Sequence, residues 1–243
     1  MKAIITCFLF VFLIGPALGQ SFYFGPKGGA SIGFQRWENF QQSPLLSYHG
    51  AFFMESYSEE NPDNSLFAQI GWHNRGSAFR NQRFITIDGD LINVPTKNFV
   101  FSNAVLGVGG KRKQKINKKL HSYYLIGLRA EYTVLTNLSD YDEFNKFFNQ
   151  PFYPDNQFVK KFNYGVTVGG GFEYKLNKMV GGILEFSIQP DLSRQYEQPP
   201  LPSIPDPWNP GRLITARERR IKNITLELSL GLRFLRKVIY LDY

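Results

Sequence analysis

Cysteine, histidine and long apolar runs are scarce in this sequence of 243 residues, and each scarcity excludes a class of protein. The one cysteine, Cys7, lies in the first apolar segment, so the rest of the chain can form neither a disulfide nor a thiolate metal site. His49, His73 and His121 are the only imidazoles. Beyond the first segment no apolar run reaches the roughly 18 residues that predict a transmembrane helix.

The first 19 residues have the three parts of a secretory signal peptide. Lys2 supplies the positive start, Ile4–Ile14 is the apolar run, and Ala17 and Gly19 are small residues at the positions that a signal peptidase reads. The run is too short to span a bilayer, which needs about 20 residues as a helix. We therefore expect cleavage before Gln20, export, and one domain over residues 20–243.

Strict alternation is the main structural signal in the remaining chain. Between Lys161 and Lys175 the aromatic and valine side chains share one parity, and glycine and polar side chains take the other. The segment Asn223–Phe234 alternates leucine with threonine, glutamate, serine, glycine and arginine. A period of two predicts strands with one apolar face and one small or polar face.

Eight segments follow this pattern, most of them longer than ten residues: 23–37, 46–57, 66–75, 98–110, 122–135, 161–176, 180–192 and 222–235. Strands of globular proteins usually have about five or six residues, whereas about 9–11 are needed to cross a membrane. Short and long connections alternate, which is typical of outer-membrane barrels. We predict an all-β, eight-stranded antiparallel up-and-down transmembrane β-barrel. In segment 98–110 either parity could face outward.

The polar parity of these strands carries charges of both signs, which we expect to form a paired structural network in the lumen: Lys27, Glu55, Arg129, Glu131, Glu173, Lys175, Glu185, Glu227 and Arg233. No set of nucleophile, base and orienting residue stands out, so we expect no catalytic residues and no enzyme. His49, His73 and Glu55 could together hold a metal, but their spacing does not enforce it. We expect no metal and no cofactor.

Two long connections and one basic run are candidate contact surfaces. The run from Lys111 to Lys119 has six positive charges and is expected as a solvated turn. The functional alternative places it at the periplasmic rim, in contact with anionic lipid headgroups or a periplasmic partner. The long connections contain aromatic residues that could dock a partner: Phe147, Phe148, Phe152 and Tyr153 in the first, and Trp208 among prolines in the second. Packing of these aromatics onto the barrel rim, or their placement in the lipopolysaccharide layer, is an equal alternative.

Three stretches resemble a known family. Phe24–Gly29 (FGPKGG), Gly127–Tyr132 (GLRAEY) and Leu228–Lys237 (LSLGLRFLRK) resemble PorT-like outer-membrane β-barrel proteins of the Bacteroidota. The resemblance implies an eight-stranded barrel of the OmpA or OmpX type in the outer membrane of a Gram-negative cell. For some relatives it also implies an accessory role in a type IX secretion or gliding apparatus. With a net charge of +8, the expected partners are outer-membrane lipid, lipopolysaccharide and envelope proteins, and no nucleic acid.

A soluble exported carrier of the lipocalin kind is the main alternative, because it would place its apolar parity inside and its polar parity outside. The strand faces that carry glycine and serine also carry Glu131, Glu173, Glu227 and Arg233. This favours a tight polar lumen over an apolar ligand cavity. A third possibility, an enzyme embedded in a barrel, is disfavoured because no set of nucleophile, base and orienting residue stands out.

Overall fold

The structure is a computed structural model that describes residues 21–37, 42–80, 83–85, 91–93, 95–147, 153–205 and 211–238. Eight long strands dominate it: β1 (Phe22–Trp37), β2 (Ser43–Ser56), β3 (Asn64–Phe79), β6 (Lys97–Lys115), β7 (Leu120–Thr136), β8 (Phe162–Lys175), β9 (Val180–Pro190) and β13 (Arg219–Arg236). Each overlaps one of the eight predicted segments. The predicted signal peptide lies outside the described residues and stays a prediction.

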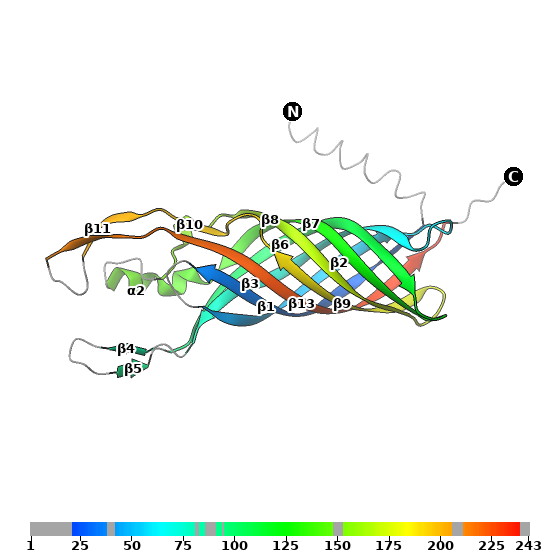
Figure 1. Ribbon diagram of the computed structural model, residues 1–243, viewed down its shortest axis with the longest axis horizontal. Coiled ribbons are helices and arrows are strands. Elements are labelled where there is room, and N and C mark those ends of the chain that lie inside the picture. The colour runs from blue at the N-terminus through cyan, green and yellow to red at the C-terminus, as the bar shows by residue number, and fades with distance from the viewer. Residues whose placement is uncertain are drawn as a thin grey trace, which may run out of the picture.

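The eight strands form a closed antiparallel ring (Figure 1). They follow one another in chain order, and β13 pairs with β1 from Phe22↔Arg236 to Trp37↔Ile221. Closure satisfies the backbone groups that the edges of an open sheet would leave unpaired. The predicted eight-stranded up-and-down barrel is therefore confirmed.

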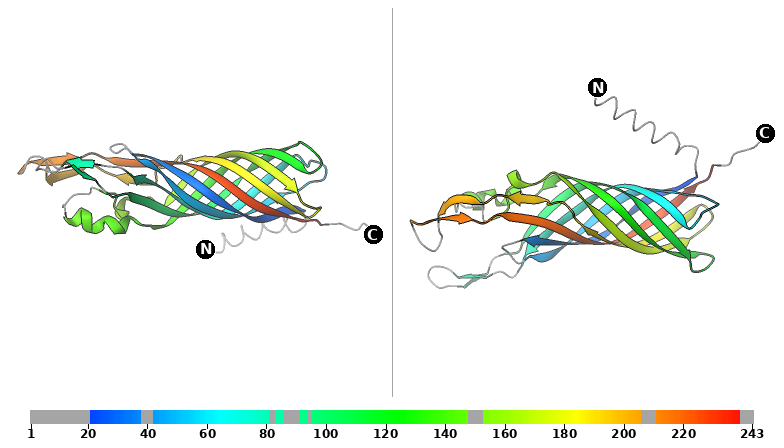
Figure 2. Two further views of the ribbon diagram at one scale, coloured as in Figure 1. Left: turned by 90° about the horizontal axis from the view of Figure 1, so that it is seen from below. Right: turned by 45° about the horizontal axis from the view of Figure 1, so that its top comes forward.

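The two ends of the barrel differ. At the short-turn rim, tight connections join β2 to β3, β6 to β7 and β8 to β9, and the first and last described residues lie there too (Figure 1). At the long-loop end the chain continues well beyond the ring (Figure 2). The extra elements there are β4 (Arg83–Ile85), β5 (Leu91–Asn93), η2 (Leu138–Tyr141), α2 (Asp142–Phe147), η3 (Asn156–Phe158), β10 (Tyr196–Gln198), β11 (Leu201–Pro205) and β12 (Leu213–Ala216). Within the described ranges, no helix is long and apolar enough to cross a membrane.

The barrel is inverted relative to a soluble protein, with apolar side chains outside and polar ones inside. On β13, Leu228 is 52% exposed, whereas its neighbours Glu227 and Ser229 are 4% and 3% exposed. The other long strands alternate in the same way, except that β3 is buried on both faces from His73 to Phe79. The result is an apolar outer wall that includes Leu46, Ile70, Leu106, Ile126, Leu128, Val168, Phe186, Leu228 and Leu230. This is the opposite of a lipocalin-like carrier.

On β6, where the sequence left the parity open, the odd-numbered residues face inward. Phe99, Phe101, Asn103 and Val105 are buried, while Leu106 and Val108 are exposed on the outer wall. The inward face of this strand is apolar near the long-loop end and charged near the other end. Apolar and polar residue types therefore alternate poorly in the sequence of β6, although its inward and outward side chains alternate regularly in the structure.

Close approach between β1 and β13 explains two of the glycines. A Cβ added to Gly25 would lie 1.9 Å from the carbonyl oxygen of Leu232, and one added to Gly29 would lie equally close to that of Leu228. Only glycine allows the backbones to pack this tightly. The strands therefore coil into a narrow barrel.

Candidate functional site

The interior of the barrel is a balanced network of buried charges. Six carboxylates face six cations in it: Glu55, Glu131, Glu173, Glu185, Asp191 and Glu227, with Lys27, Arg75, Lys111, Lys113, Arg129 and Arg233. None of these side chains is more than 10% exposed. Charges that are taken out of water need partners, and here the two signs balance.

The layer nearest the short-turn rim joins four strands. Lys111 Nζ lies 2.7 Å from Glu55 Oε2 and 3.2 Å from Glu173 Oε1. Lys113 contacts the same two carboxylates, and Arg233 forms an ion pair with Glu173. Each carboxylate in this layer is therefore shared by at least two cations.

The prediction that the whole basic run forms a solvated turn is wrong for Lys111 and Lys113. The strand β6 continues to Lys115, so the turn itself spans only residues 116–119. The strand period then points 111 and 113 inward and Arg112 outward. In the sequence, Glu55 and Glu173 have the inward parity of their strands and need cationic partners in the lumen. That need was the signal that these lysines belong inside.

In the next layer, Lys27 Nζ lies 2.5 Å from Glu185 Oε1, and Tyr123 Oη donates to Glu185 Oε2 over 2.9 Å. Buried apolar side chains fill the space around this pair: Phe53, Phe67, Leu125 and Ile183. The cavity that remains there has a volume of about 10 Å³, enough for a single water molecule. The lumen is therefore packed at this level.

The middle layer contains two histidines, His49 on β2 and His73 on β3. His73 Nδ1 lies 2.5 Å from Glu227 Oε1, His49 Nε2 lies 2.8 Å from Ser229 Oγ, and the two rings are 5.3 Å apart. Glu55, the third member of the conceivable metal set, belongs instead to the lysine layer near the rim. Across the described part of the chain, no group of three or more His, Cys, Asp or Glu residues is arranged to hold a metal ion.

The fourth layer crosses the lumen. From β3, Arg75 reaches Glu131 on β7 at 2.9 Å and Asp191, directly after β9, at 3.2 Å. Arg129 contacts the same two carboxylates, and Asn223 Nδ2 donates to Asp191 over 2.7 Å. Sequence reasoning missed Arg75 and Asp191, although they continue the inward parities of His73 and Gln189.

Eight of the nine predicted lumen residues therefore lie in the network. Lys175 is the exception, and its placement in the network is wrong: it has the inward parity of Glu173, but it is the last residue of β8 and is exposed at the short-turn rim. The barrel interior ends before it, so this side chain projects into solvent.

Above the fourth layer an aromatic cluster seals the long-loop end. Its buried members are Trp37, Phe79, Phe99, Phe101, Leu138, Tyr141, Tyr153, Tyr196 and Ile221. The ring of Phe99 lies 5.2 Å from that of Trp37 and 5.1 Å from that of Tyr141. Burial raises the pKa of Tyr196 to about 12 and also raises the pKa values of Tyr141 and Tyr153, because a phenolate cannot be hydrated there.

The predicted docking residues have different outcomes. Tyr153 is only 2% exposed and packs in the aromatic cluster, so its prediction as an exposed docking residue is wrong and the rim-packing alternative holds. Phe147 ends α2. Phe148, Phe152 and Trp208 lie outside the described residues.

A closed eight-stranded ring with an apolar wall and a filled polar interior defines the fold of small outer-membrane β-barrels. Among solved structures, the chain is similar to OprG from Pseudomonas aeruginosa, with a TM-score of 0.53 at 8% identity over 90% of this chain and 97% of that one. This similarity shows the fold alone. No family model matches the sequence, and no curated protein matches it.

Two further structures are similar at lower scores. Neisserial surface protein A has a TM-score of 0.43 at 10% identity, over 88% of this chain and 96% of that one. The outer-membrane protease OmpT from Escherichia coli has a TM-score of 0.43 at 9% identity, over 90% and 97%. The expectation that the chain is not an enzyme stays a prediction.

Proposed function

We propose that this chain is an outer-membrane β-barrel protein, exported through the signal peptide of residues 1–19, with a structural or interaction role in the cell envelope. The observation that carries the proposal is the radial inversion of the barrel. A wall that exposes Leu228 and Leu230 to its surroundings while enclosing Glu227 and Arg233 is stable in lipid and costly in water. The short-turn rim then faces the periplasm and the long-loop end faces outward.

The filled lumen supports a role other than conduction. Four layers of ion pairs join opposite strands, and the aromatic cluster covers them at the long-loop end. Side chains such as Arg75 and Lys111 would have to leave their carboxylate partners before a solute could pass. Eight-stranded barrels generally enclose only enough space for side chains.

The elements beyond the barrel support an interaction role. The β4–β5 hairpin and the β11–β12 hairpin extend past the ring (Figure 2), and Leu213 on β12 is 63% exposed. Solvent-exposed apolar side chains on protruding hairpins are suited to contact with another envelope component. Membership of the PorT-like family and an accessory role in a secretion or gliding apparatus rest on the sequence resemblance.

Membrane fractionation tests the proposal. The protein is expected in the outer-membrane fraction, soluble only with detergent, and to migrate faster on an SDS gel before boiling than after. Recovery in the periplasmic pool without detergent would contradict it and favour the soluble carrier.

A pair of variants sharpens this test. Leu228→Arg, in the middle of the outer wall, is expected to lower stability in lipid bilayers by about 2–4 kcal/mol. Leu213→Arg, at a side chain that is at least as exposed but lies beyond the ring, is the matched control and is expected to have no effect. Equal stabilities of the two variants in lipid would contradict the membrane position.

The accessory role has its own experiment. Deletion of the gene is expected to reduce protein secretion or surface motility, and the full-length chain is expected to restore it. A variant in which a short linker replaces residues 199–218, with the barrel still folded, is expected not to. Normal secretion and motility in the deletion strain would contradict the accessory role and leave the membrane position untouched.

A further inference from the structure

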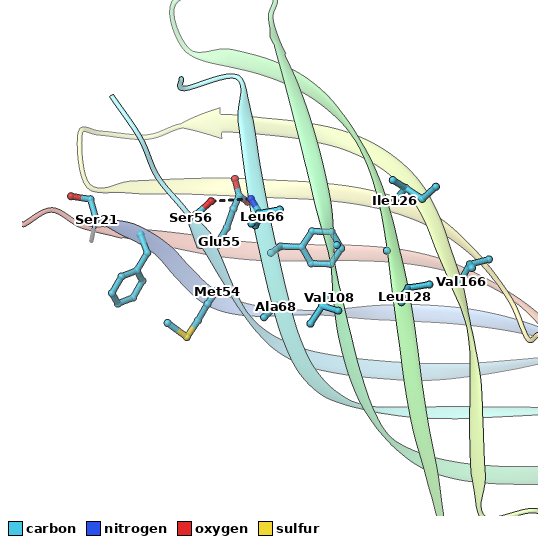
Figure 3. A pocket seen from close by; sticks show the side chains of 14 residues that line it. Ser21, Met54, Glu55, Ser56, Leu66, Ala68, Val108, Ile126, Leu128 and Val166 are labelled. Carbon is cyan, nitrogen blue, oxygen red and sulfur yellow. Dashed lines mark hydrogen bonds between the residues drawn. The ribbon is translucent and has the colours of Figure 1, made fainter. Parts of the chain in front are cut away.

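The outer wall is hollowed near the short-turn rim (Figure 3). Two depressions of about 730 and 350 Å³ lie next to each other and share Ser56, Leu66 and Ile126 in their linings. We call the two together the wall groove. It crosses the outer face of β2, β3, β6, β7 and β8, and the inward residues Glu55, Ser65 and Lys111 also border it.

Cross-strand pairing arranges the lining of the wall groove in three rows. The row nearest the rim is polar: Arg112 pairs with Asn64 on one side and with Tyr124 on the other. The third row is apolar and contains Met54, Ala68, Val108, Leu128 and Val166 (Figure 3). The groove therefore passes from a cationic end to an apolar end within a few residues.

The middle row explains why the wall is hollow. Gly110 lies between Leu66 and Ile126, whose side chains are 72% and 63% exposed. A Cβ added to Gly110 would meet nothing within 4 Å. The backbone at Gly110 thus forms the floor of the groove between the side chains of Leu66 and Ile126. On β3, the small side chain of Ala68 leaves the groove open in the third row.

The cationic end of the groove is formed by the guanidinium of Arg112. Arg112 is exposed, points outward, and forms no ion pair with any residue that the structure describes, unlike the inward Lys111 and Lys113 beside it. Tyr124 is exposed next to it, at the level where aromatic residues of outer-membrane barrels meet lipid headgroups. A basic side chain at such a surface attracts anionic lipid.

We propose that the wall groove binds one anionic phospholipid, with the phosphate at Arg112 and an acyl chain lying over Gly110 toward Ala68 and Val108. The inference rests on the proposed membrane position of the barrel. A lipid matches both ends of the groove: charge complements the Arg112 end, and the third row continues the apolar wall that faces acyl chains. A second copy packed wall to wall would place apolar side chains over the groove, and these supply no anion for the guanidinium.

Native mass spectrometry of the detergent-solubilised barrel with added phosphatidylglycerol tests the proposal. The wild-type protein is expected to retain one lipid. Arg112→Gln is expected to weaken binding by about fivefold, the effect of one basic residue near an anionic surface. Gly110→Leu fills the floor of the groove and is expected to abolish retention.

Matched variants control for general effects on the wall. Gly50→Leu adds the same side chain at another outward glycine where a Cβ meets nothing within 4 Å and which does not line the groove, so it is expected to retain the lipid. Lys222→Gln removes an outward charge near the other end of the barrel and is expected to bind as the wild type does.

Equal lipid retention by wild type, Arg112→Gln and Gly110→Leu would overturn the inference, as would a dimer that Gly110→Leu dissociates. Heat-modifiable migration on SDS gels separates this failure from failure of the proposed function. A folded, membrane-extracted barrel that retains no lipid contradicts only the lipid site. A chain recovered without detergent contradicts the membrane position itself.

Discussion

The Nδ1 atom of His73 lies 2.5 Å from Oε1 of Glu227 inside the barrel, although 154 residues separate the two in the chain. Both side chains are almost completely enclosed. Their strands, β3 and β13, are not neighbours in the ring, so the contact spans the interior. Each layer of the network is built in this way, and removal of one member leaves charges with no access to water.

Glu227→Gln is therefore expected to destabilise the barrel by about 3–5 kcal/mol, the usual cost of leaving a buried charge without its partner. Denaturant unfolding in detergent micelles, followed by tryptophan fluorescence, measures the change. The control is Glu197→Gln, because Glu197 pairs with Arg194 in a half-exposed salt bridge whose loss costs less than about 1 kcal/mol. A variant at 227 as stable as the control would show that the pair with His73 contributes little.

Amine labelling of the folded barrel is expected to separate the lysines of the basic run. Lys111 and Lys113 are enclosed by carboxylates and should remain unmodified, whereas Lys115, Lys118 and Lys119 are exposed and should react. Peptide mass spectrometry after labelling reads out each site, and labelling of the unfolded protein serves as the control. Modification of Lys111 in the folded state at the rate of Lys115 would contradict the extended β6.

Gly25→Ala is expected to block barrel formation, because the added methyl group would overlap the carbonyl oxygen of Leu232 on the paired strand. Gly50→Ala is the matched control, since its new Cβ meets no atom within 4 Å. The fraction of heat-modifiable protein on an SDS gel measures the yield of folded barrel. Equal yields would mean that β1 and β13 can separate without cost.

Much of this fold can be predicted from alternation alone, because a period of two fixes both the strand and the face of each side chain. The ends of the strands are harder to predict. The odd-numbered residues of β6 change from Phe99 and Phe101 to Lys111 and Lys113, and the lysines suggest a turn unless the carboxylates of Glu55 and Glu173 are considered. Register across the ring, which brings these groups together, cannot be obtained from the pattern within one segment.

The long-loop end was less predictable for a different reason. Tyr153 lies in a segment without periodicity, and only the packing of η2, α2 and β10 onto the ends of the long strands buries it. An aromatic residue in an irregular segment has the same local pattern whether it is buried or exposed. The network was underestimated in a similar way, because Arg75 is the last residue of its predicted strand and Asp191 is the next to last of its own.

Phe99→Ala is expected to loosen the long-loop end while leaving the eight-stranded barrel intact. The ring of Phe99 is fully buried against Trp37, Phe79 and Tyr141, and loss of such a side chain costs about 3–5 kcal/mol. Limited proteolysis should cleave the segment 137–160 faster, with heat modifiability unchanged. Phe162→Ala, on the exposed face of β8, is the control and should not alter cleavage.

High pH is expected to loosen the same region. The pKa of Tyr196 is raised by burial to about 12, above the value of 10.0 for a free phenol, so folding favours its protonated form. The resulting stability is complete below pH 10 and is lost as the pH rises through about 12. Ultraviolet titration of tyrosinate combined with proteolysis measures this, and Tyr196→Phe should remove part of the pH dependence. Titration of Tyr196 near pH 10 would contradict its burial.

The pairing of β1 with β13 has a consequence for the assembly of the barrel. The first strand can close the barrel only by pairing with the last one, so a chain that stops before Arg219 is a sheet with two open edges and an exposed apolar face. Such partly built sheets pair readily with one another. We therefore expect both open edges to persist until β13 has joined the sheet, so that a truncated chain aggregates rather than forming a smaller barrel.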